Sequence, residues 1–207
     1  MRWGAGTSVH LVEPGRTDSR PGICVLLAGP PGTGKHTIGS ALTDRLALTR
    51  EVRLVDNHYV ANPILGLVQQ DGVSSLPRDV WTRVGEVRAA VLETIARLSP
   101  PAWSFVFTAD VAEDDESYAF VEHLASVAAA RGTELVVIRL VCELAELRSR
   151  IVSPARRLRM KSTSESDAVQ RHGQGLAALE HWSPVTLDVT LLEPGAAVEE
   201  ILRRSGL

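Results

Sequence analysis

The chain has 207 residues, of which 44% are hydrophobic and 23% are charged, as expected for one globular domain with a sizeable core. Its formal net charge of −3 argues against a dedicated nucleic-acid-binding protein, which is normally basic overall. Residues 1–20 contain no apolar run typical of a signal peptide or a membrane span. We therefore expect a cytoplasmic protein that binds neither nucleic acid nor membrane.

We expect residues 1–20 to form a flexible extension and residues 21–207 to form a single domain, because the first segment is rich in Gly, Arg, Ser, Thr and Pro. The two cysteines, Cys24 and Cys142, lie in apolar runs of strand type. We predict that both are buried as small hydrophobic residues in a reducing compartment, without a disulfide bond.

An apolar run of strand type, residues 23–28, leads into the segment 29–37, which we call the glycine loop. Its sequence is Gly-Pro-Pro-Gly-Thr-Gly-Lys-His-Thr, and a helical pattern follows it. The glycines allow successive backbone N–H groups to point at one anion, while the helix N-terminus and Lys35 add positive potential. The residues predicted to bind the phosphates of a nucleoside triphosphate are Gly29, Gly32, Thr33, Gly34, Lys35, His36 and Thr37.

His36 departs from the usual pattern of such a loop. The residue after the lysine is normally a Ser or Thr whose hydroxyl binds Mg²⁺, whereas here the hydroxyl comes one place later, at Thr37. Because Mg²⁺ prefers oxygen ligands, we expect His36 to have a structural role rather than to bind the metal. The residues that hold Mg²⁺ stay unassigned.

A second strand is predicted over residues 52–56 and ends at Asp56. In an open α/β sheet, polar residues at the carboxyl end of a strand lie where ligands bind. Since an imidazole titrates near neutral pH, His58 is interpreted as a second base or acceptor ligand, or else as a residue that orders the next loop. Residues 60–77 are expected to form an irregular insertion that covers the acceptor site.

Residues 78–98 carry apolar side chains at helical spacing and are predicted to form a helix. Arg88 borders the apolar stripe and is expected either to extend along the surface to water or to point into a cleft. A third strand over residues 104–108 precedes Asp110, which either holds Mg²⁺ through water or is an ordinary loop residue. The acidic run 113–116 is interpreted as the capped first turn of the next helix.

The nearly continuous apolar run 134–142 is typical of a parallel strand that is covered on both faces. A helix is predicted over residues 144–151, and residues 169–179 show a helical pattern interrupted by glycines. A fifth strand is predicted over residues 185–190 and a closing helix over residues 194–202. This alternation predicts an α/β fold with a doubly wound parallel sheet.

Basic residues gather at the end of the helix over residues 144–151 and beyond it. They are Arg148, Arg150, Arg156, Arg157, Arg159 and Lys161. In a chain of net negative charge, they are expected either to face solvent or to bind a polyanion. A triphosphate on the glycine loop is a natural partner for them.

With these motifs the chain resembles the small-molecule and nucleoside monophosphate kinase branch of the P-loop proteins, which includes shikimate kinase, gluconate kinase and chloramphenicol phosphotransferase. The resemblance rests on the glycine loop, which has the Walker A pattern, on Asp56, on the arginines after the fourth strand and on the Asp-Val-Thr run at 188–190. It implies a three-layer P-loop NTPase fold. The implied five-stranded parallel sheet has the order 2-3-1-4-5, with helices on both faces and an arginine-rich lid.

The family implies roles for the matching residues. Lys35 and the lid arginines Arg150 and Arg157 would stabilise the transferred phosphoryl group. Asp56 would bind the acceptor hydroxyl and act as its base. The loop after the fifth strand, with Thr190, would border the adenine.

The sequence thus predicts an ATP-dependent kinase, a monomer or homodimer, that phosphorylates a hydroxyl of a small molecule such as an antibiotic or another metabolite. We expect ATP and Mg²⁺ as its ligands, and Asp56, His58, Asn62 and Arg88 around the acceptor. Two alternatives stay open. A nucleotide-binding switch without kinase activity is supported by His36, and a nucleotide kinase differs in its acceptor alone.

Overall fold

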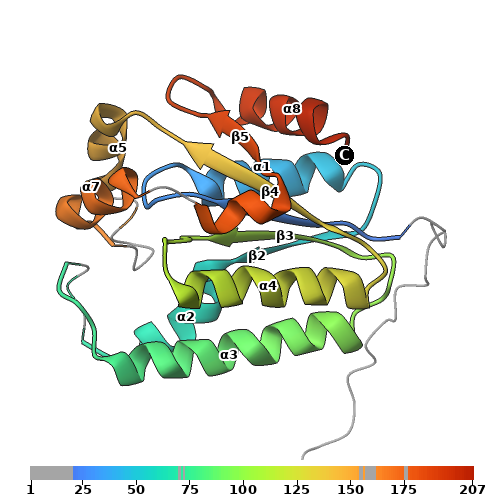
Figure 1. Cartoon of the computed structure of the whole chain (residues 1–207), viewed down its shortest axis with the longest axis horizontal. Coiled ribbons are helices and arrows are strands. Elements are labelled where there is room, and N and C mark those ends of the chain that lie inside the picture. The colour runs from blue at the N-terminus through green and yellow to red at the C-terminus, as the bar shows by residue number, and fades with distance from the viewer. Residues whose placement is uncertain (1–20, 70, 72, 154–155, 157–161, 175–176) are drawn as a thin grey trace, which may run out of the picture.

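In the computed structural model, shown in Figure 1, the central strand is β1 (Cys24–Ala28), and all five of its residues are buried. The strand order is β2-β3-β1-β4-β5, and every neighbouring pair is parallel. The other strands are β2 (Val52–Asp56), β3 (Ser104–Ala109), β4 (Leu135–Val141) and β5 (Val185–Asp188). The predicted fold class and strand order are therefore confirmed.

The structure describes residues 21–207 except 70, 72, 154–155, 157–161 and 175–176. Residues 1–20, for which a flexible extension is expected, lie outside this part of the chain. No helix of the described residues is both long enough and apolar enough to cross a bilayer.

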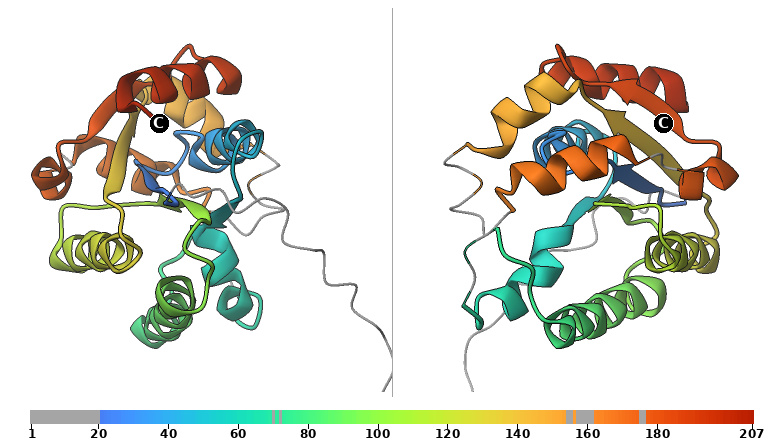
Figure 2. Two further views of the ribbon diagram at one scale, coloured as in Figure 1. Left: turned by 90° about the vertical axis from the view of Figure 1, so that its right-hand side faces the viewer. Right: turned by 60° about the vertical axis from the view of Figure 1, so that its left-hand side comes forward.

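Helices cover both faces of the sheet, as Figures 1 and 2 show. The helices of one face are α1 (Lys35–Leu46) and α8 (Pro194–Ser205), and those of the other are α3 (Arg78–Arg97) and α4 (Asp115–Ala130). Because side chains alternate along a strand, β1 contributes Val25 and Leu27 to the first core and Leu26 to the second. Two hydrophobic cores therefore hold the central strand from both sides.

The parallel arrangement brings the functional motifs to one edge of the sheet. Ala28 pairs with Ala109, and Asp56 pairs with Thr108. The glycine loop, which follows Ala28, therefore starts beside the carboxyl ends of β2 and β3. Open α/β sheets bind their ligands at this edge.

The prediction of an irregular insertion over residues 60–77 is wrong for the first part of this range, because α2 (Asn57–Leu65) is a helix. The side chain of Asp56 accepts a hydrogen bond from the His58 N–H and so caps this helix. Ala61 and Leu65 of α2 pack against Val84 of α3. Capping and burial together outweigh the unfavourable effect of Pro63, which lies inside the helix.

The segment after β4 contains three short helical pieces. They are α5 (Leu144–Ile151), α7 (Glu165–Gly173) and the 3₁₀ helix η1 (Ala177–Trp182). The helical pattern over residues 169–179 is thus divided between α7 and η1, which begins after the glycines. Figure 2 shows α5 and α7 side by side near the glycine-loop end of the sheet.

Two smaller predictions are also confirmed. Asp114 accepts a hydrogen bond from the Ser117 N–H and caps α4, so the acidic run is a helix start. Cys24 and Cys142 are both buried and free. Burial raises the pKa of the Cys24 thiol to about 11, and thiols of this kind are unreactive.

Candidate active site

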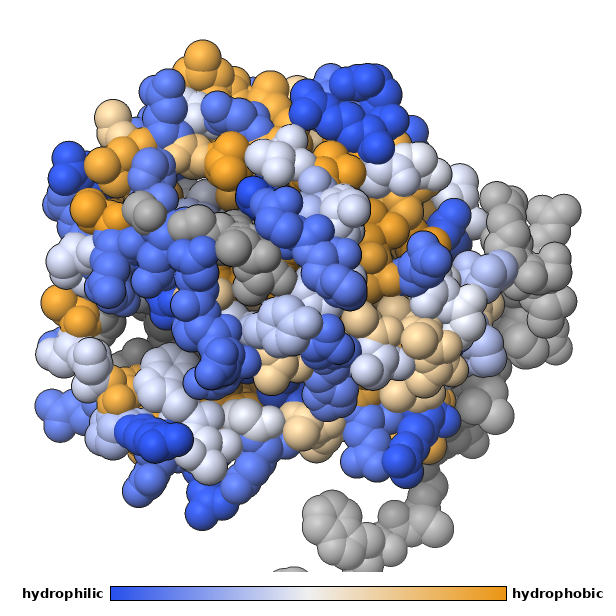
Figure 3. All heavy atoms as spheres, viewed as in Figure 1, coloured by the Kyte–Doolittle hydropathy of each residue, from blue (hydrophilic) through white to orange (hydrophobic). Residues whose placement is uncertain are grey.

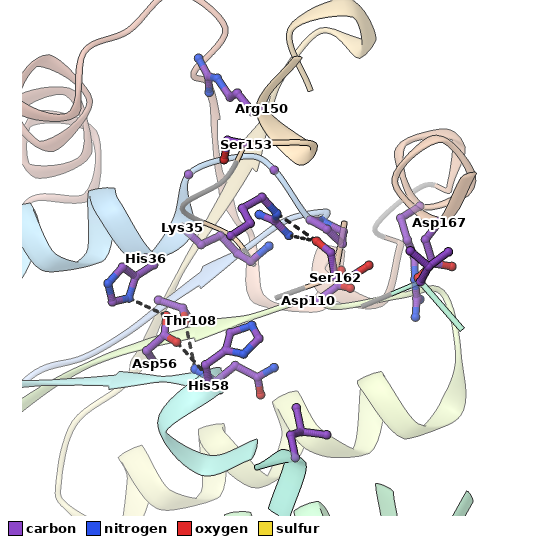
Figure 4. A pocket seen from close by; sticks show the side chains of 18 of the residues that line it. Lys35, His36, Asp56, His58, Thr108, Asp110, Arg150, Ser153, Ser162 and Asp167 are labelled. Carbon is purple, nitrogen blue, oxygen red and sulfur yellow. Dashed lines mark hydrogen bonds and ion pairs between the residues drawn. The ribbon is translucent and has the colours of Figure 1, made fainter. Parts of the chain in front are cut away.

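A cavity of about 630 Å³ lies at the carboxyl edge of the sheet. Its walls come from the glycine loop, from the ends of β2 and β3, from α2, from segment 73–81 and from the described residues between 150 and 171. In the space-filling view of Figure 3, the molecule is hollowed on the left side, where this edge lies. Figure 4 shows the side chains that line the cavity.

The backbone of the glycine loop has conformations that favour glycine. Gly32 has a φ of 99° and Gly34 has a φ of 84°, and both are in the left-handed region. A Cβ on Gly32 would lie 3.2 Å from the Cγ of Leu147, and a Cβ on Gly29 would lie 2.5 Å from the carbonyl oxygen of Leu140. The loop is therefore a compact cradle that leads into the N-terminus of α1, as binding of a triphosphate requires.

Lys35 is hydrogen-bonded to the loop itself. Its Nζ donates to the carbonyl oxygens of Gly29, at 2.5 Å, and Pro30, at 2.8 Å. Thr33 is fully buried, and its hydroxyl also donates to Pro30 O, at 2.9 Å. Thr33 therefore stiffens the loop, while Lys35 lines the cavity and is within reach of a phosphate bound there.

Asp56 is a buried carboxylate at the cavity wall, with only 2% of the residue exposed. Its Oδ2 accepts hydrogen bonds from the Thr108 hydroxyl at 2.9 Å and from His36 Nδ1 at 3.0 Å. Its Oδ1 accepts from the His58 N–H at 2.9 Å. These donors on three different elements fix the orientation of the carboxylate, as Figure 4 shows.

The two histidines lie on opposite sides of Asp56 and both line the cavity. The His36 ring lies edge-on to the Tyr59 ring, with 6.4 Å between the ring centres. His58 Nδ1 donates to Asn62 Oδ1 at 3.3 Å. His36 thus contacts the carboxylate directly, a position from which an imidazole orients a neighbouring acid.

Asp110 follows β3 and faces the same cavity. Its Oδ1 is buried and has no hydrogen-bond partner among the described residues. Burial raises the pKa of this carboxyl group, and the positive charges of Lys35, Arg171 and Arg156 act in the opposite direction. A buried acceptor without a donor suits a cation or a metal-bound water.

A bound Mg²⁺ would need a nucleotide to supply some of its ligands. No group of three or more His, Cys, Asp or Glu residues in the described part of the chain could hold a metal ion. Asp110 and the hydroxyl of Thr37, which both line the cavity, are oxygen donors of the kind that Mg²⁺ prefers. These residues fit a metal that arrives bound to a triphosphate.

Of the residues that the structure describes between 150 and 171, three arginines line the cavity: Arg150, Arg156 and Arg171. Arg156 donates from Nε and from a terminal nitrogen to Ser162 O, at 3.0 and 2.8 Å, and burial lowers its pKa. Arg150 donates to Glu146 at 2.7 Å and to Thr190 O at 2.9 Å. Figure 4 shows Arg150 at the end of the cavity away from Asp56.

Several predicted site residues lie elsewhere. Arg157 is outside the described residues, and Asn62, Arg88 and Thr190 are not among those that line the cavity. Arg88 donates to Asn57 Oδ1 at 3.1 Å and lies over the Phe120 ring, with 4.9 Å to its centre. The Thr190 hydroxyl donates to Asp188 and accepts from the Glu143 N–H.

The sequence reasoning missed part of the cavity wall. Asp167 and Arg171 face the cavity from α7. Their four-residue spacing puts both on one face of a helix, and this pattern could have indicated that they lie together. The apolar lining residues Leu65, Val73 and Trp81 had no such signal. Leu65 and Val73 lie in the segment 60–77 that was expected to cover the acceptor site, and Trp81 lies on the helix predicted over residues 78–98, but no spacing singled out these side chains.

The glycine loop directly after β1, the sheet order 2-3-1-4-5 and the arginine-bearing segment after β4 together define the P-loop fold of small-molecule and nucleoside monophosphate kinases. This confirms the resemblance found in the sequence. No protein-family model matches the sequence, and no curated protein matches it either.

Solved structures with this fold include a gluconokinase from Sinorhizobium meliloti 1021, at 15% identity and a TM-score of 0.57, over 90% of this chain and 94% of that one. A tunicamycin resistance protein from Deinococcus radiodurans is 17% identical over 91% and 97% of the two chains, with a TM-score of 0.55. Shikimate kinase from Acinetobacter baumannii, in complex with shikimate, is 16% identical over 88% and 92%, with a TM-score of 0.52. Likenesses at these identities establish the fold.

Proposed function

We propose that this protein is an ATP-dependent phosphotransferase that moves the γ-phosphoryl group to a hydroxyl group of a small molecule, a metabolite or an antibiotic. The observation that carries this proposal is the position of Asp56. Its oriented, buried carboxylate faces the same cavity of about 630 Å³ as Lys35 and the glycine loop. A proton acceptor and a phosphate cradle at one cavity are what hydroxyl phosphorylation needs.

The chemistry follows from this arrangement. The acceptor oxygen forms a bond to the γ-phosphorus, and the bond between that phosphorus and the β,γ-bridging oxygen breaks, so that ADP leaves. The hydroxyl proton passes to Asp56 and from there to water. Because Thr108, His36 and the His58 N–H hold the carboxylate, it keeps one orientation while it accepts the proton.

The positively charged side chains of the cavity stabilise the phosphoryl group during its transfer. Lys35, Arg156 and Arg171 line it together, and they neutralise negative charge on the phosphoryl oxygens in the transition state. Mg²⁺, with Asp110 and Thr37 as protein oxygen donors, would supply further charge neutralisation on the phosphates.

The test is a transfer assay with purified protein, γ-labelled ATP and MgCl₂. The acceptor panel contains hydroxylated metabolites, nucleoside monophosphates and antibiotics, the last because a tunicamycin resistance protein has this fold. We expect a phosphorylated product, identified by mass spectrometry. Asp56→Asn should lower kcat by about 10²–10³, because it removes the proton acceptor, and should leave the Kd for ATP nearly unchanged.

Asparagine is a suitable replacement because it is also a good N-cap residue, so α2 stays capped. Asp44→Asn is the control, since it makes the same change of side chain at an exposed position of α1 that is absent from the cavity lining, and it should not alter kcat. Tight ATP binding without transfer to any acceptor would favour the nucleotide-binding switch. Transfer to nucleoside monophosphates alone would identify a nucleotide kinase.

A further inference from the structure

One wall of the cavity is apolar although water reaches it. This wall consists of Leu65, Val73, Leu76 and Trp81, and we call it the apolar wall. Val73 is 61% exposed and Trp81 is 47% exposed. When a ligand covers exposed apolar side chains around a cavity, the burial of apolar surface makes the free energy of binding more favourable.

None of the residues between 57 and 81 that line the cavity is Lys or Arg. Residues 57–77 contain neither Lys nor Arg, and apart from His58 and Tyr59 their one ionisable side chain is Asp71. Arg78, which follows directly, is exposed and is absent from the cavity lining. Asp71 accepts hydrogen bonds from the Val73 N–H and from the N–H and hydroxyl of Ser74. This turn places a negative charge next to the apolar wall and so disfavours an anionic ligand.

The cations that line the cavity come from other segments. Lys35 belongs to the glycine loop, and the arginines that line the cavity lie within segment 150–171. On α3, the arginine expected to face the acceptor, Arg88, instead contacts Asn57 and the Phe120 ring. Among the described residues from 57 to 97, no Lys or Arg lines the cavity, so this side of the lining provides no such partner for a carboxylate or phosphate, whose burial without a partner is costly.

Polar groups of the hydrogen-bonding kind are present at the same end. Ser74, Ser75, His58 and Asn57 all line the cavity, and hydroxyl, imidazole and amide groups pair well with hydroxyls of a ligand. Asp56 lies beside His58 at the position proposed for the reacting hydroxyl. The acceptor end thus combines an apolar surface with hydrogen-bonding groups.

We propose that the acceptor is an uncharged amphipathic alcohol, whose reacting hydroxyl lies at Asp56 and whose apolar body lies on the apolar wall. This inference rests on the proposed phosphotransferase function, which it narrows to one substrate class. It excludes nucleoside monophosphates and sugar acids as the preferred acceptors, because both carry a negative charge that needs a cation.

The experiment compares two alcohols of nearly the same shape that differ in charge. Methyl 4-(hydroxymethyl)benzoate is neutral, and 4-(hydroxymethyl)benzoate is an anion at pH 7. Transfer from ATP is measured for both, together with glycerol as a neutral polyol without an apolar body. We expect kcat/KM for the ester to exceed that for the acid and for glycerol by at least about tenfold, a difference in transition-state binding.

Variants of the wall give a second readout. Trp81→Ala should raise KM for the ester about tenfold, because it removes an aromatic surface from the site, and should leave KM for ATP unchanged; Trp81→Phe should retain most of the affinity. Leu98→Ala is the control, since Leu98 is 78% exposed at the end of α3 and is absent from the cavity lining.

Binding is measured separately by saturation-transfer NMR in the presence of a non-hydrolysable ATP analogue. Equal or better transfer to the acid overturns the inference and leaves the proposed phosphotransferase function intact. If the ester binds at the apolar wall but no phosphoryl group is transferred to it or to any other alcohol, the proposed function is overturned, and the apolar wall is supported as a binding site for a neutral alcohol. Absence of ester binding overturns the inference.

Discussion

His36 occupies the loop position where a Ser or Thr normally binds Mg²⁺, and its ring donates a hydrogen bond to the buried carboxylate of Asp56. The side chain of His36 is 19% exposed. Because a serine Oγ lies nearer to the backbone than a histidine Nδ1, we expect a serine at this position to lose the direct contact of 3.0 Å that His36 Nδ1 makes with the carboxylate. The imidazole therefore has a positioning role that a hydroxyl does not replace.

We predict that His36→Ser lowers kcat by about tenfold, since a less well-held catalytic group loses part of its effective concentration, while the Kd for ATP stays within about threefold of that of the wild type. Steady-state kinetics and calorimetric titration with an ATP analogue measure the two effects. His36→Asn keeps a donor near Asp56 and should restore part of the rate. Unchanged or faster turnover in His36→Ser would show that the ring merely fills the place of the hydroxyl.

At the scale of single elements, the glycine loop is held tightly by its neighbours. Gly32 lies against Leu147 of α5, with room for no Cβ without movement. Gly132, after α4, also has a positive φ, of 73°, but a Cβ there would meet nothing within 4 Å. The two glycines share the conformational requirement and differ in packing.

This difference predicts unequal effects of alanine. Gly132→Ala should destabilise the protein by about 1 kcal/mol, the cost of a left-handed alanine, and leave ATP binding unchanged. Gly32→Ala should destabilise it more, because a steric contact is added to the same conformational cost, and should weaken ATP binding at least about tenfold. Thermal unfolding and ATP titration of both variants check the prediction, which is wrong if the two variants behave alike.

The arginines after β4 also differ in what they face. Arg156 lines the cavity and is bonded to a backbone carbonyl, whereas Arg148 of α5 forms a salt bridge with Glu165, at 3.0 Å, between half-exposed side chains. A charge held at the cavity wall acts on a bound phosphate more strongly than one in water.

Arg156→Ala should accordingly reduce kcat by about 10²-fold, in the range typical of removing one group that stabilises transition-state charge. Arg148→Ala is its control and should change kcat by less than about twofold, because exposed ion pairs contribute little. Pre-steady-state measurement of phosphoryl transfer separates this effect from product release. Equal losses in the two variants would assign the segment a role in stability alone.

For the molecule as a whole, the cavity places charged side chains, among them the buried carboxylate of Asp110, at one edge of the sheet. This burial of charge lowers the stability of the folded state. Burial raises the pKa of Asp110 above its ordinary value of 3.8. The folded state therefore binds this proton more tightly than the unfolded chain, so the contribution of Asp110 to stability falls as pH rises from about 4 through the raised pKa. Above that pKa the folded protein carries an unfavourable buried charge.

Asp110→Asn should raise Tm at pH 7, by on the order of a few degrees, and the difference from the wild type should disappear below about pH 4. The same change should lower Mg²⁺-dependent turnover, since it removes a negative oxygen donor from the site. Calorimetry between pH 3 and pH 8 measures the first effect. Asp44→Asn, on the exposed side of α1, should show neither, and a lower Tm for Asp110→Asn at pH 7 would contradict the argument.

Much of the fold follows from local sequence patterns. The apolar runs that become β1, β3 and β4 are continuous because both faces of the sheet are covered, and the stripe over residues 78–98 marks α3 within one residue. The glycine loop and Asp56 are recognisable because their spacing relative to a strand end has a direct physical meaning. The helix α2 was not recognisable, because its stability depends on contacts with Val84 that lie far along the chain.

The sequence by itself predicted the strands, the polar residues at their carboxyl ends and the glycine loop, because each depends on residues adjacent in the chain. Tertiary structure decided which side chains share the cavity: it brought Arg171 and Trp81 to the site and directed Arg88 to Asn57 and Phe120. It also joined His36 to Asp56. The physical reason is that a side chain's partner is set by the packing of separate helices on the sheet, and local spacing carries no information about that packing.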